Sequence, residues 1–262
     1  MIDTHTEIRD EVAKLCAKFP GPYWQEKDRN RDYPGEFVTA LTEAGYLSVL
    51  IPEEHGGSGL PLSAAAAILE EIQAQGCNGS ACHAQMYTMG TLLRHGSEAQ
   101  KAEYLPKIAT GDLRLQAFGV TEPTSGTDTL SLKTTAKRHG DEYIINGQKI
   151  WTSYADKADW IFALVRTDTS VKHDGISFLL IDMEQDGVEA RPITMISGAS
   201  PFCETFFTDA TAPKGNLVGE LNKGWTIAKR LLQHEREMIS GMGMGSGGGG
   251  TGLADLAKDY VG

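Results

Sequence analysis

Glu235 is the residue of this sequence best suited to act as a general base. It lies in the segment WTIAKRLLQHEREMISGM, where apolar residues recur three or four positions apart and form one helical stripe. The residues of that stripe are Ala228, Leu231, Leu232, Met238, Ile239 and Met242. Glu235 falls on the same stripe, and burial there would raise the pKa of its carboxyl group, which suits proton removal. The alternative is an ion pair at the edge of the stripe, with Arg236 as the partner.

A glycine-rich segment, Gly241–Gly252, follows this candidate base. It contains G-x-G-x-x-G at Gly243, Gly245 and Gly248, but a dinucleotide-binding fingerprint follows a strand, and no strand precedes this one. A flexible linker is one interpretation. If the helix instead continues, its missing side chains leave either a wide pocket for a branched or cyclic substrate or a close contact with another helix.

Composition excludes several classes of function. The chain has 262 residues, and 24 Lys and Arg stand against 35 Asp and Glu, so the net charge is −11 and no basic run favours nucleic acid. No apolar run approaches the ~20 residues of a membrane span, and the charged start does not resemble a signal peptide. Of the four cysteines, only Cys77 and Cys82 lie close together, without the second half of a zinc site. We therefore expect no metal and a cytoplasmic protein with reduced thiols.

Two changes of pattern along the chain predict the elements that position Glu235. Residues 1–112 show helical spacing and helix-ending glycines, which predict an all-helical domain. Residues 113–222 are short runs rich in β-branched and aromatic residues, separated by turn sequences, which predict an antiparallel β-barrel-like domain. Helical periodicity returns in residues 223–262, so the fold class is α+β. A lone amphipathic helix is marginal in water, so we expect a shortened form of a longer protein or covering partner chains.

Five phrases of the sequence resemble the acyl-CoA dehydrogenases and occur in that family's order. They are IPEEHGGSG (Ile51–Gly59), SEAQKAEYLPKIATGD (Ser97–Asp112), AFGVTEPTSGTD (Ala117–Asp128), DEYIINGQKIWTS (Asp141–Ser153) and NLVGELNKGW (Asn216–Trp225). The resemblance implies an N-terminal helical domain over 1–112 and a middle β domain over 113–222. It implies that 223–262 is the first helix of an incomplete C-terminal four-helix bundle.

The resemblance also implies an FAD site. In the family, the segment matching Phe118–Thr127 runs past the flavin and its diphosphate. Trp151 would pack on the isoalloxazine ring, and the Ser153 hydroxyl would face N5 and O4. Backbone groups near Val120 and Thr121 would meet the pyrimidine edge. The residues implied for FAD binding are Phe118, Val120, Thr121, Gly126, Thr127, Trp151, Thr152 and Ser153.

The same resemblance bears on the base and the substrate. Isovaleryl and long-chain members carry the base at the position that Glu235 matches, whereas most members carry it on a later helix. Gln233, Arg236 and Thr127 match positions that contact the substrate, although Gln233 stands where the family more often has Asp.

The implied reaction is α,β-dehydrogenation of an acyl-CoA thioester to the trans-2-enoyl-CoA, with electrons passed to an electron-transfer flavoprotein. The resemblance implies a homotetramer or heterotetramer for the complete protein. Two alternatives remain open at this point. One is an acyl-CoA oxidase or flavin monooxygenase of the same fold, and the other is a non-catalytic partner subunit of a heteromeric dehydrogenase.

Overall fold

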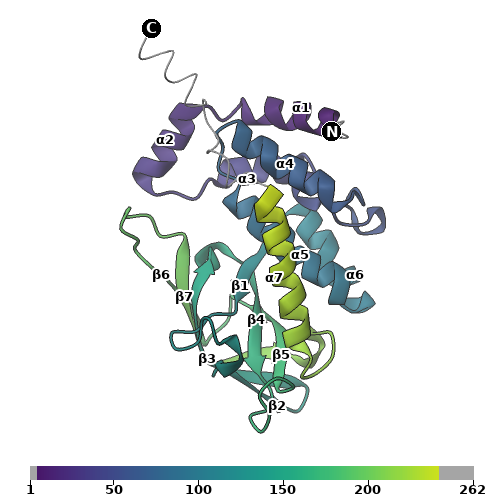
Figure 1. Ribbon diagram of the computed structural model, residues 1–262, viewed down its shortest axis with the longest axis vertical. Coiled ribbons are helices and arrows are strands. Elements are labelled where there is room, and N and C mark those ends of the chain that lie inside the picture. Colours follow the sequence, from purple (N-terminus) through teal and green to yellow (C-terminus); the bar gives the residue numbers. More distant parts are fainter. Residues whose placement is uncertain (1–4, 242–262) are drawn as a thin grey trace.

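The structure, a computed structural model, describes residues 5–241, and it describes side chains from residue 5 to residue 233. Helices occupy one end of the molecule and a sheet the other, and α7 runs along both (Figure 1). The helices are α1 (Thr6–Cys16), α2 (Gly21–Asn30), α3 (Gly35–Glu43), α4 (Leu62–Ala74), α5 (Ser80–His95), α6 (Glu98–Thr110) and α7 (Gly224–Gly241). The strands are β1 (Leu115–Gly119), β2 (Thr135–His139), β3 (Glu142–Ser153), β4 (Trp160–Arg166), β5 (Ile176–Asp182), β6 (Val188–Pro192), β7 (Phe202–Pro213) and β8 (Leu217–Val218). The predicted α+β fold is confirmed.

Local sequence signals account for both ends of α6. The Ser97 hydroxyl accepts the Gln100 backbone N–H at 3.2 Å, and the Gln100 side chain accepts the Ser97 N–H at 2.9 Å, so a capping box starts α6. Gly111 ends α6 with a φ of 84°, in the left-handed region that favours glycine. Helix α2 was not predicted, because its sequence GPYWQEKDRN buries no residue and so shows no apolar stripe.

The strands form one sheet in the order β6-β7-β3-β2-β4-β5-β8, and β1 pairs with β4. Most neighbouring strands are antiparallel, as predicted, but β1 runs parallel to β4, and β2 makes one parallel pairing with β4, between Thr135 and Arg166. The reason for the parallel course of β1 lies at the start of β1 and β4. The Asp159 carboxylate accepts the Arg114 backbone N–H at 2.5 Å, and the Arg114 carbonyl accepts the Asp159 N–H at 3.1 Å. Both strands therefore leave from the same end of the sheet and run side by side.

Helix α5 joins the helical part of the molecule to the sheet. The Thr88 hydroxyl of α5 donates a hydrogen bond to the carbonyl of Leu115, the first residue of β1. Met89 and Leu92 of α5 lie in an apolar cluster that also holds Phe162 and Phe178 from β4 and β5. Burial of these side chains fixes α5 against β1, the strand in which the phrase AFGVTEPTSGTD begins.

Helix α7 shows the predicted stripe as far as its side chains are described. Ala228 and Leu231 are buried and Leu232 is half-buried, whereas Lys229 and Arg230 on the other side are exposed. The α7 backbone is helical to Gly241, so Glu235 and Arg236 lie on the helix. Their side chains, and all of residues 242–262 with the glycine-rich segment, lie outside the described part of the chain.

The direction of α7 along α5 follows from the apolar clusters that the two helices share. Ile227 and Ala228 belong to a cluster with Met89 and Leu92 in the C-terminal half of α5. Leu231, one turn further along α7, belongs to a cluster with residues of the N-terminal half of α5. The α5 residues of that second cluster are Ala81, Cys82, Ala84, Met86 and Tyr87. The part of α7 that carries Glu235 therefore advances toward the N-terminal end of α5.

One glycine lets β3 approach the segment before β2, and its replacement gives a test of this packing. Gly147 has a φ of 148°, and a Cβ there would lie 2.5 Å from the Thr134 hydroxyl and 2.6 Å from its Cα. We expect Gly147→Ala to lower the free energy of unfolding by about 2–3 kcal/mol, measured by denaturant titration. In the control Gly215→Ala, the Cβ meets no atom within 4 Å, so we expect a change within ~0.5 kcal/mol. Equal stability of the two variants would contradict the close approach.

Candidate functional site

The two phrases implied in flavin binding lie side by side, where β1 and β3 end. The Ile150 backbone N–H donates to the Thr121 carbonyl at 2.9 Å. The Lys149 ammonium donates to the Val120 carbonyl at 3.3 Å. These bonds join Phe118–Thr127 to the last residues of β3. Each carbonyl thereby accepts a bond within the protein, which leaves the N–H groups of this segment and the Thr121 hydroxyl as the donors for a ligand.

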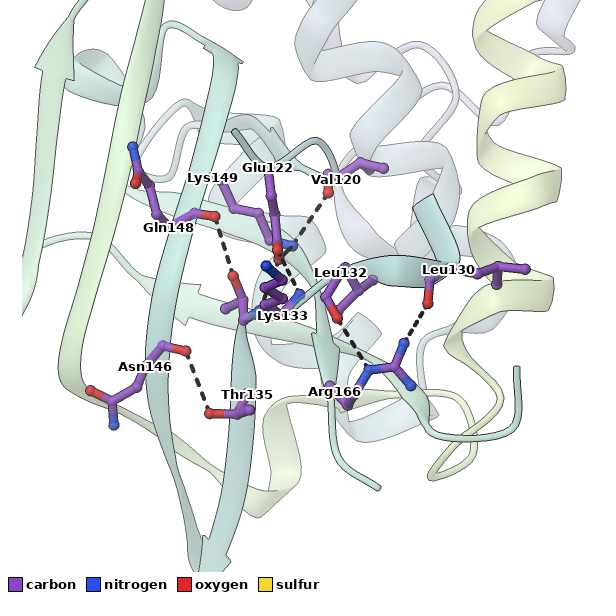
Figure 2. A network of polar contacts seen from close by, with 11 residues as sticks. Val120, Glu122, Leu130, Leu132, Lys133, Thr135, Asn146, Gln148, Lys149 and Arg166 are labelled. Atoms are coloured by element: carbon purple, nitrogen blue, oxygen red, sulfur yellow. Dashed lines mark hydrogen bonds and ion pairs between the residues drawn. The ribbon is translucent and has the colours of Figure 1, made fainter. Parts of the chain in front are cut away.

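A buried ion pair supports this junction (Figure 2). Lys149 Nζ lies 2.8 Å from Glu122 Oε1, and the two side chains are 0% and 4% exposed. The other contacts of Glu122 are the backbone N–H groups of Lys133 at 2.6 Å and Thr134 at 2.9 Å. A single carboxylate thus ties the segment after β1 both to β3 and to the chain entering β2.

The ionisation of the pair follows from burial and mutual attraction. Burial by itself raises the pKa of the Glu122 carboxyl, but the charge and hydrogen bond of Lys149, together with Lys133 and Thr134, outweigh it and lower that pKa. Burial lowers the pKa of the Lys149 ammonium to about 8, against the opposing charge of Glu122. Both groups are therefore predominantly charged at neutral pH.

Arg166 on β4 holds the loop that follows the ion pair (Figure 2). Its guanidinium donates to the carbonyls of Leu130 at 2.7 Å and Leu132 at 3.2 Å. It also reaches the carbonyls of Val171 and Lys172 at 3.0 and 3.1 Å. The planar guanidinium thus ties the loop after Thr127 to the loop between β4 and β5.

Trp151 is turned outward by an irregularity in β3. Residues Tyr143, Ile145 and Lys149 are all buried, so regular alternation would bury Trp151 as well. The register of β3 against β7 shifts between Lys149 and Thr152, and Trp151 has a φ of 61°. As a result the indole is 54% exposed and Thr152 is fully buried. A left-handed backbone at a bulky residue costs about 1–2 kcal/mol, which commonly marks a functional position.

Two hydroxyl groups within these phrases are buried without a hydrogen-bond partner among the described residues, as is Thr205 Oγ1 on β7 opposite Lys149. They are Thr152 Oγ1, at the end of β3, and Ser125 Oγ, in the turn that begins at Glu122. A buried hydroxyl without a partner is disfavoured, so these atoms suit a ligand that supplies one. The other implied residues differ in exposure. Phe118, Val120, Thr121 and Ser153 are half-buried, and Gly126 and Thr127 are exposed.

Of the candidate substrate residues on α7, the structure describes the side chain of Gln233 but only the backbone of Arg236. Gln233 is exposed, off the apolar stripe, and it lies one turn or less from Glu235 on the described backbone. The side chains of Glu235 and Arg236 lie outside the described part of the chain. The structure therefore places their backbone along α5 but does not place their functional groups.

Sequence reasoning missed the ion pair and Ser125, although both belong to phrases that it singled out. One signal was present for the pair: Lys149 has the same parity along β3 as the apolar residues Tyr143 and Ile145, which predicts a buried position. A buried lysine requires an acidic partner, and Glu122 stands in the neighbouring phrase. No sequence signal set Ser125 apart from an ordinary turn serine.

The described residues hold neither a disulfide nor a cluster of metal ligands. Cys16, Cys77, Cys82 and Cys203 are buried and unpaired. Across residues 5–233, no group of three His, Cys, Asp or Glu side chains could hold a metal ion. Within the described part of the chain, every helix is too short or too polar to cross a membrane.

Known protein families match both halves of the chain. The acyl-CoA dehydrogenase N-terminal domain matches residues 2–112, and the acyl-CoA dehydrogenase middle domain matches residues 117–210. Among curated proteins, acyl-CoA dehydrogenase IpdE1 of Mycobacterium tuberculosis is 39% identical over 221 residues, which are 83% of this chain and 57% of the relative. The chain thus spans little more than half the length of that relative.

Solved structures give the same result. The acyl-CoA dehydrogenase of Geobacillus kaustophilus superposes with a TM-score of 0.85 at 30% identity, over 92% of this chain and 65% of the other. A structure named Tcur3481-Tcur3483 steroid ACAD superposes with a TM-score of 0.78 at 34% identity, over 90% of this chain and 63% of the other. The fold, the two matched domains and these relatives together show that this chain belongs to the acyl-CoA dehydrogenase family.

Proposed function

We propose that the protein catalyses the FAD-dependent α,β-dehydrogenation of an acyl-CoA thioester. The observation that carries the proposal is Trp151, held with its indole exposed by a strained backbone beside the junction of β1 and β3. An exposed indole of this kind offers a flat apolar surface to an aromatic ring. The family to which the chain belongs supports the same reaction.

The residues present fit FAD. Trp151 offers a face to the flavin ring, and the N–H groups of the segment at Val120 and Thr121 offer donors to its polar edge. Thr152 Oγ1 and Ser125 Oγ are buried hydroxyls without partners among the described residues, as a polar ligand would require. Exposed Gly126 and Thr127, with half-buried Phe118 and Ser153, complete the proposed set. When bound, FAD supplies the acceptor for the hydride that leaves the β carbon.

The protein's own part in the reaction is to remove a proton and to hold the groups in place. We assign proton removal from the α carbon to Glu235, which lies on the α7 backbone beside α5. Gln233, Arg236 and Thr127 are the proposed substrate contacts. The buried Lys149–Glu122 pair and Arg166 keep the segment after β1 in one position, so that the donors need not reorganise during the reaction.

Electron transfer and assembly belong to the same proposal. We propose an electron-transfer flavoprotein as the acceptor and a homotetramer or heterotetramer as the complete assembly. The relative named Tcur3481-Tcur3483 pairs two differently named chains and supports the heteromeric form, and its description as a steroid ACAD supports a bulky acyl group. The unpaired buried cysteines support a cytoplasmic setting.

The test is anaerobic mixing of the purified, flavin-loaded protein with a panel of acyl-CoA thioesters. Bleaching of the flavin absorbance by a thioester supports dehydrogenation, whereas a protein that binds no FAD under any condition would support the partner-subunit alternative. Readmission of oxygen then separates the acceptors. Rapid reoxidation with hydrogen peroxide release would favour an oxidase, and slow reoxidation would favour a flavoprotein acceptor.

Trp151 gives a prediction with opposite effects on binding and on stability. Ring stacking contributes about 1–3 kcal/mol to binding. We therefore expect Trp151→Gly to weaken FAD binding roughly 5- to 150-fold. Glycine adopts the left-handed backbone of position 151 without the strain that tryptophan has there. We therefore expect the apoprotein to gain about 1 kcal/mol in free energy of unfolding. Fluorescence titration with FAD and denaturant unfolding of the apoprotein measure the two effects. Trp151→Phe is the control and should retain most of the affinity; unchanged FAD affinity in the glycine variant would remove Trp151 from the site.

A further inference from the structure

Helix α5 presents one row of residues toward the candidate site. His83, Tyr87, Gly90 and Arg94 recur three or four positions apart, so they share a face of the helix. The Tyr87 ring lies with its centroid 6.3 Å from that of Phe118, the residue with which the proposed flavin segment begins. This row therefore borders the proposed flavin site.

A mostly apolar cavity of about 150 Å³ lies along the same face of α5. Its lining residues are Leu50, Leu62, Met86, Tyr87, Gly90, Leu93 and Arg94. Gly90 leaves this space free: a Cβ added there would meet no atom within 4 Å, so a side chain at position 90 would project into the cavity. Apolar cavities with a few polar groups are typical places for the hydrocarbon part of a ligand.

His83 is the polar residue at the next turn of this row. Its ring centroid lies 5.0 Å from that of Tyr87, and its Nε2 atom is buried without a hydrogen-bond partner among the described residues. Leaving such an atom unsatisfied costs about 1–3 kcal/mol, which a ligand atom at hydrogen-bond distance would recover. The position of His83 is thus explained if a polar group of a ligand reaches it.

The charge of His83 limits what that group can be. Burial lowers the pKa of the imidazole to about 4, so the ring is neutral at neutral pH. A neutral imidazole has one N–H donor and one acceptor nitrogen, which suits a hydroxyl or a carbonyl oxygen. A carboxylate would gain more from a charged partner.

The course of α7 places the proposed base near the same turn of α5. Leu231 shares an apolar cluster with Tyr87, and α7 continues from there toward the N-terminal end of α5. Glu235 is one turn beyond Leu231, and His83 is one turn from Tyr87 in the matching direction. An acyl group that reacts beside Glu235 would therefore lie within reach of this face of α5.

We propose that His83 is a specificity-determining residue that hydrogen-bonds a hydroxyl or carbonyl oxygen on the acyl part of the substrate. The preferred substrates are then CoA thioesters whose acyl group carries an oxygen substituent, and plain hydrocarbon chains are disfavoured. This inference rests on the proposed dehydrogenase function. A hydrocarbon analogue would leave Nε2 without a partner, which lowers kcat/KM roughly 5- to 150-fold.

The experiment compares matched thioesters on the flavin-loaded, full-chain enzyme. Each pair has one carbon skeleton, linear or cyclic, with and without a hydroxyl or keto group, and the oxygen is moved along the skeleton. The variants are His83→Leu, which cannot hydrogen-bond, and His83→Asn, which can. The control is His139→Leu, because His139 is exposed on β2. Binding of the enoyl-CoA products, followed by the flavin spectrum, gives a second readout that needs no turnover.

The expected result is a preference of the native enzyme for one oxygenated position, by roughly 5- to 150-fold in kcat/KM. His83→Leu should abolish that preference in both kinetics and product binding, His83→Asn should restore part of it, and His139→Leu should leave it unchanged. A native enzyme that treats both members of every pair alike would overturn the inference. So would a His83→Leu enzyme that keeps the preference. If no thioester reduces the flavin, the proposed function itself fails, and the two failures are distinguishable.

Discussion

Lys149→Met is expected to lower the free energy of unfolding by about 3–5 kcal/mol, more than any other single change at the junction of β1 and β3. The methionine fills most of the space of the fully buried lysine, so little of the loss comes from packing. The loss comes from Glu122, whose carboxylate would remain 4% exposed and lose its cation, while keeping only the N–H groups of Lys133 and Thr134. Denaturant unfolding of the native protein and the variant measures the difference.

Lys214→Met is the matched control for this change. Lys214 pairs with Asp141 at 2.5 Å, but the two side chains are 56% and 83% exposed, and exposed ion pairs contribute little. The two variants remove the same positive charge, so they separate the effect of burial from that of net charge. A loss in Lys149→Met no greater than in Lys214→Met would show that the buried pair does not stabilise the fold.

The pH dependence of the Lys149→Met loss follows from Glu122. In the native protein its pKa is lowered, so its contribution to stability is present above the ordinary glutamate range and disappears as pH falls through the folded value. In the variant, burial without a cation raises that pKa, so the variant loses stability as pH rises instead. The stability difference between the two proteins should therefore grow from acid toward neutral pH.

The fold was predictable wherever neighbours in sequence determine structure. The Ser97 capping box and the helix-ending Gly111 are local signals, and they set both ends of α6. The parallel pairing of β1 with β4 depends on the hydrogen bond between Arg114 and Asp159, which are 45 residues apart. The pattern of residues within either strand does not predict this contact. Helix α2 was missed for a related reason: it buries none of its residues, so its sequence carries no apolar stripe that would predict a helix.

The candidate site shows the same limit at finer scale. Alternation along β3 predicts that Trp151 faces inward with Lys149, yet the register shift turns the indole outward and Thr152 inward. A left-handed backbone at a tryptophan has no sequence signal, because local preference disfavours it. Resemblance to a family identified Trp151, whereas physical reasoning on the sequence alone gives the opposite orientation. The exposure of the indole is thus a property that only the tertiary structure supplies.

Glu235→Gln is expected to lower the rate of flavin reduction by the best thioester about 10²- to 10⁴-fold. Glutamine keeps the size of the side chain on α7 and removes only the ability to accept a proton, so FAD and thioester affinity should stay close to native values. Stopped-flow mixing under anaerobic conditions measures the rate, and flavin absorbance titration measures the affinities. A change in affinity as large as the change in rate would indicate a binding role and not a base.

Glu237→Gln is the control for that substitution, because Glu237 lies two positions further along α7 and off the predicted apolar stripe. Both variants remove one negative charge from the same turn of helix, so a purely electrostatic effect on the flavin would appear in both. A base must instead lie on the side of α7 that faces α5. Ala228 and Leu231 are buried on that side, and Lys229 and Arg230 on the other side are exposed. Helical spacing in the sequence predicts Glu235 as the carboxylate on that side, and native rates in Glu235→Gln would therefore assign the base to another part of the protein.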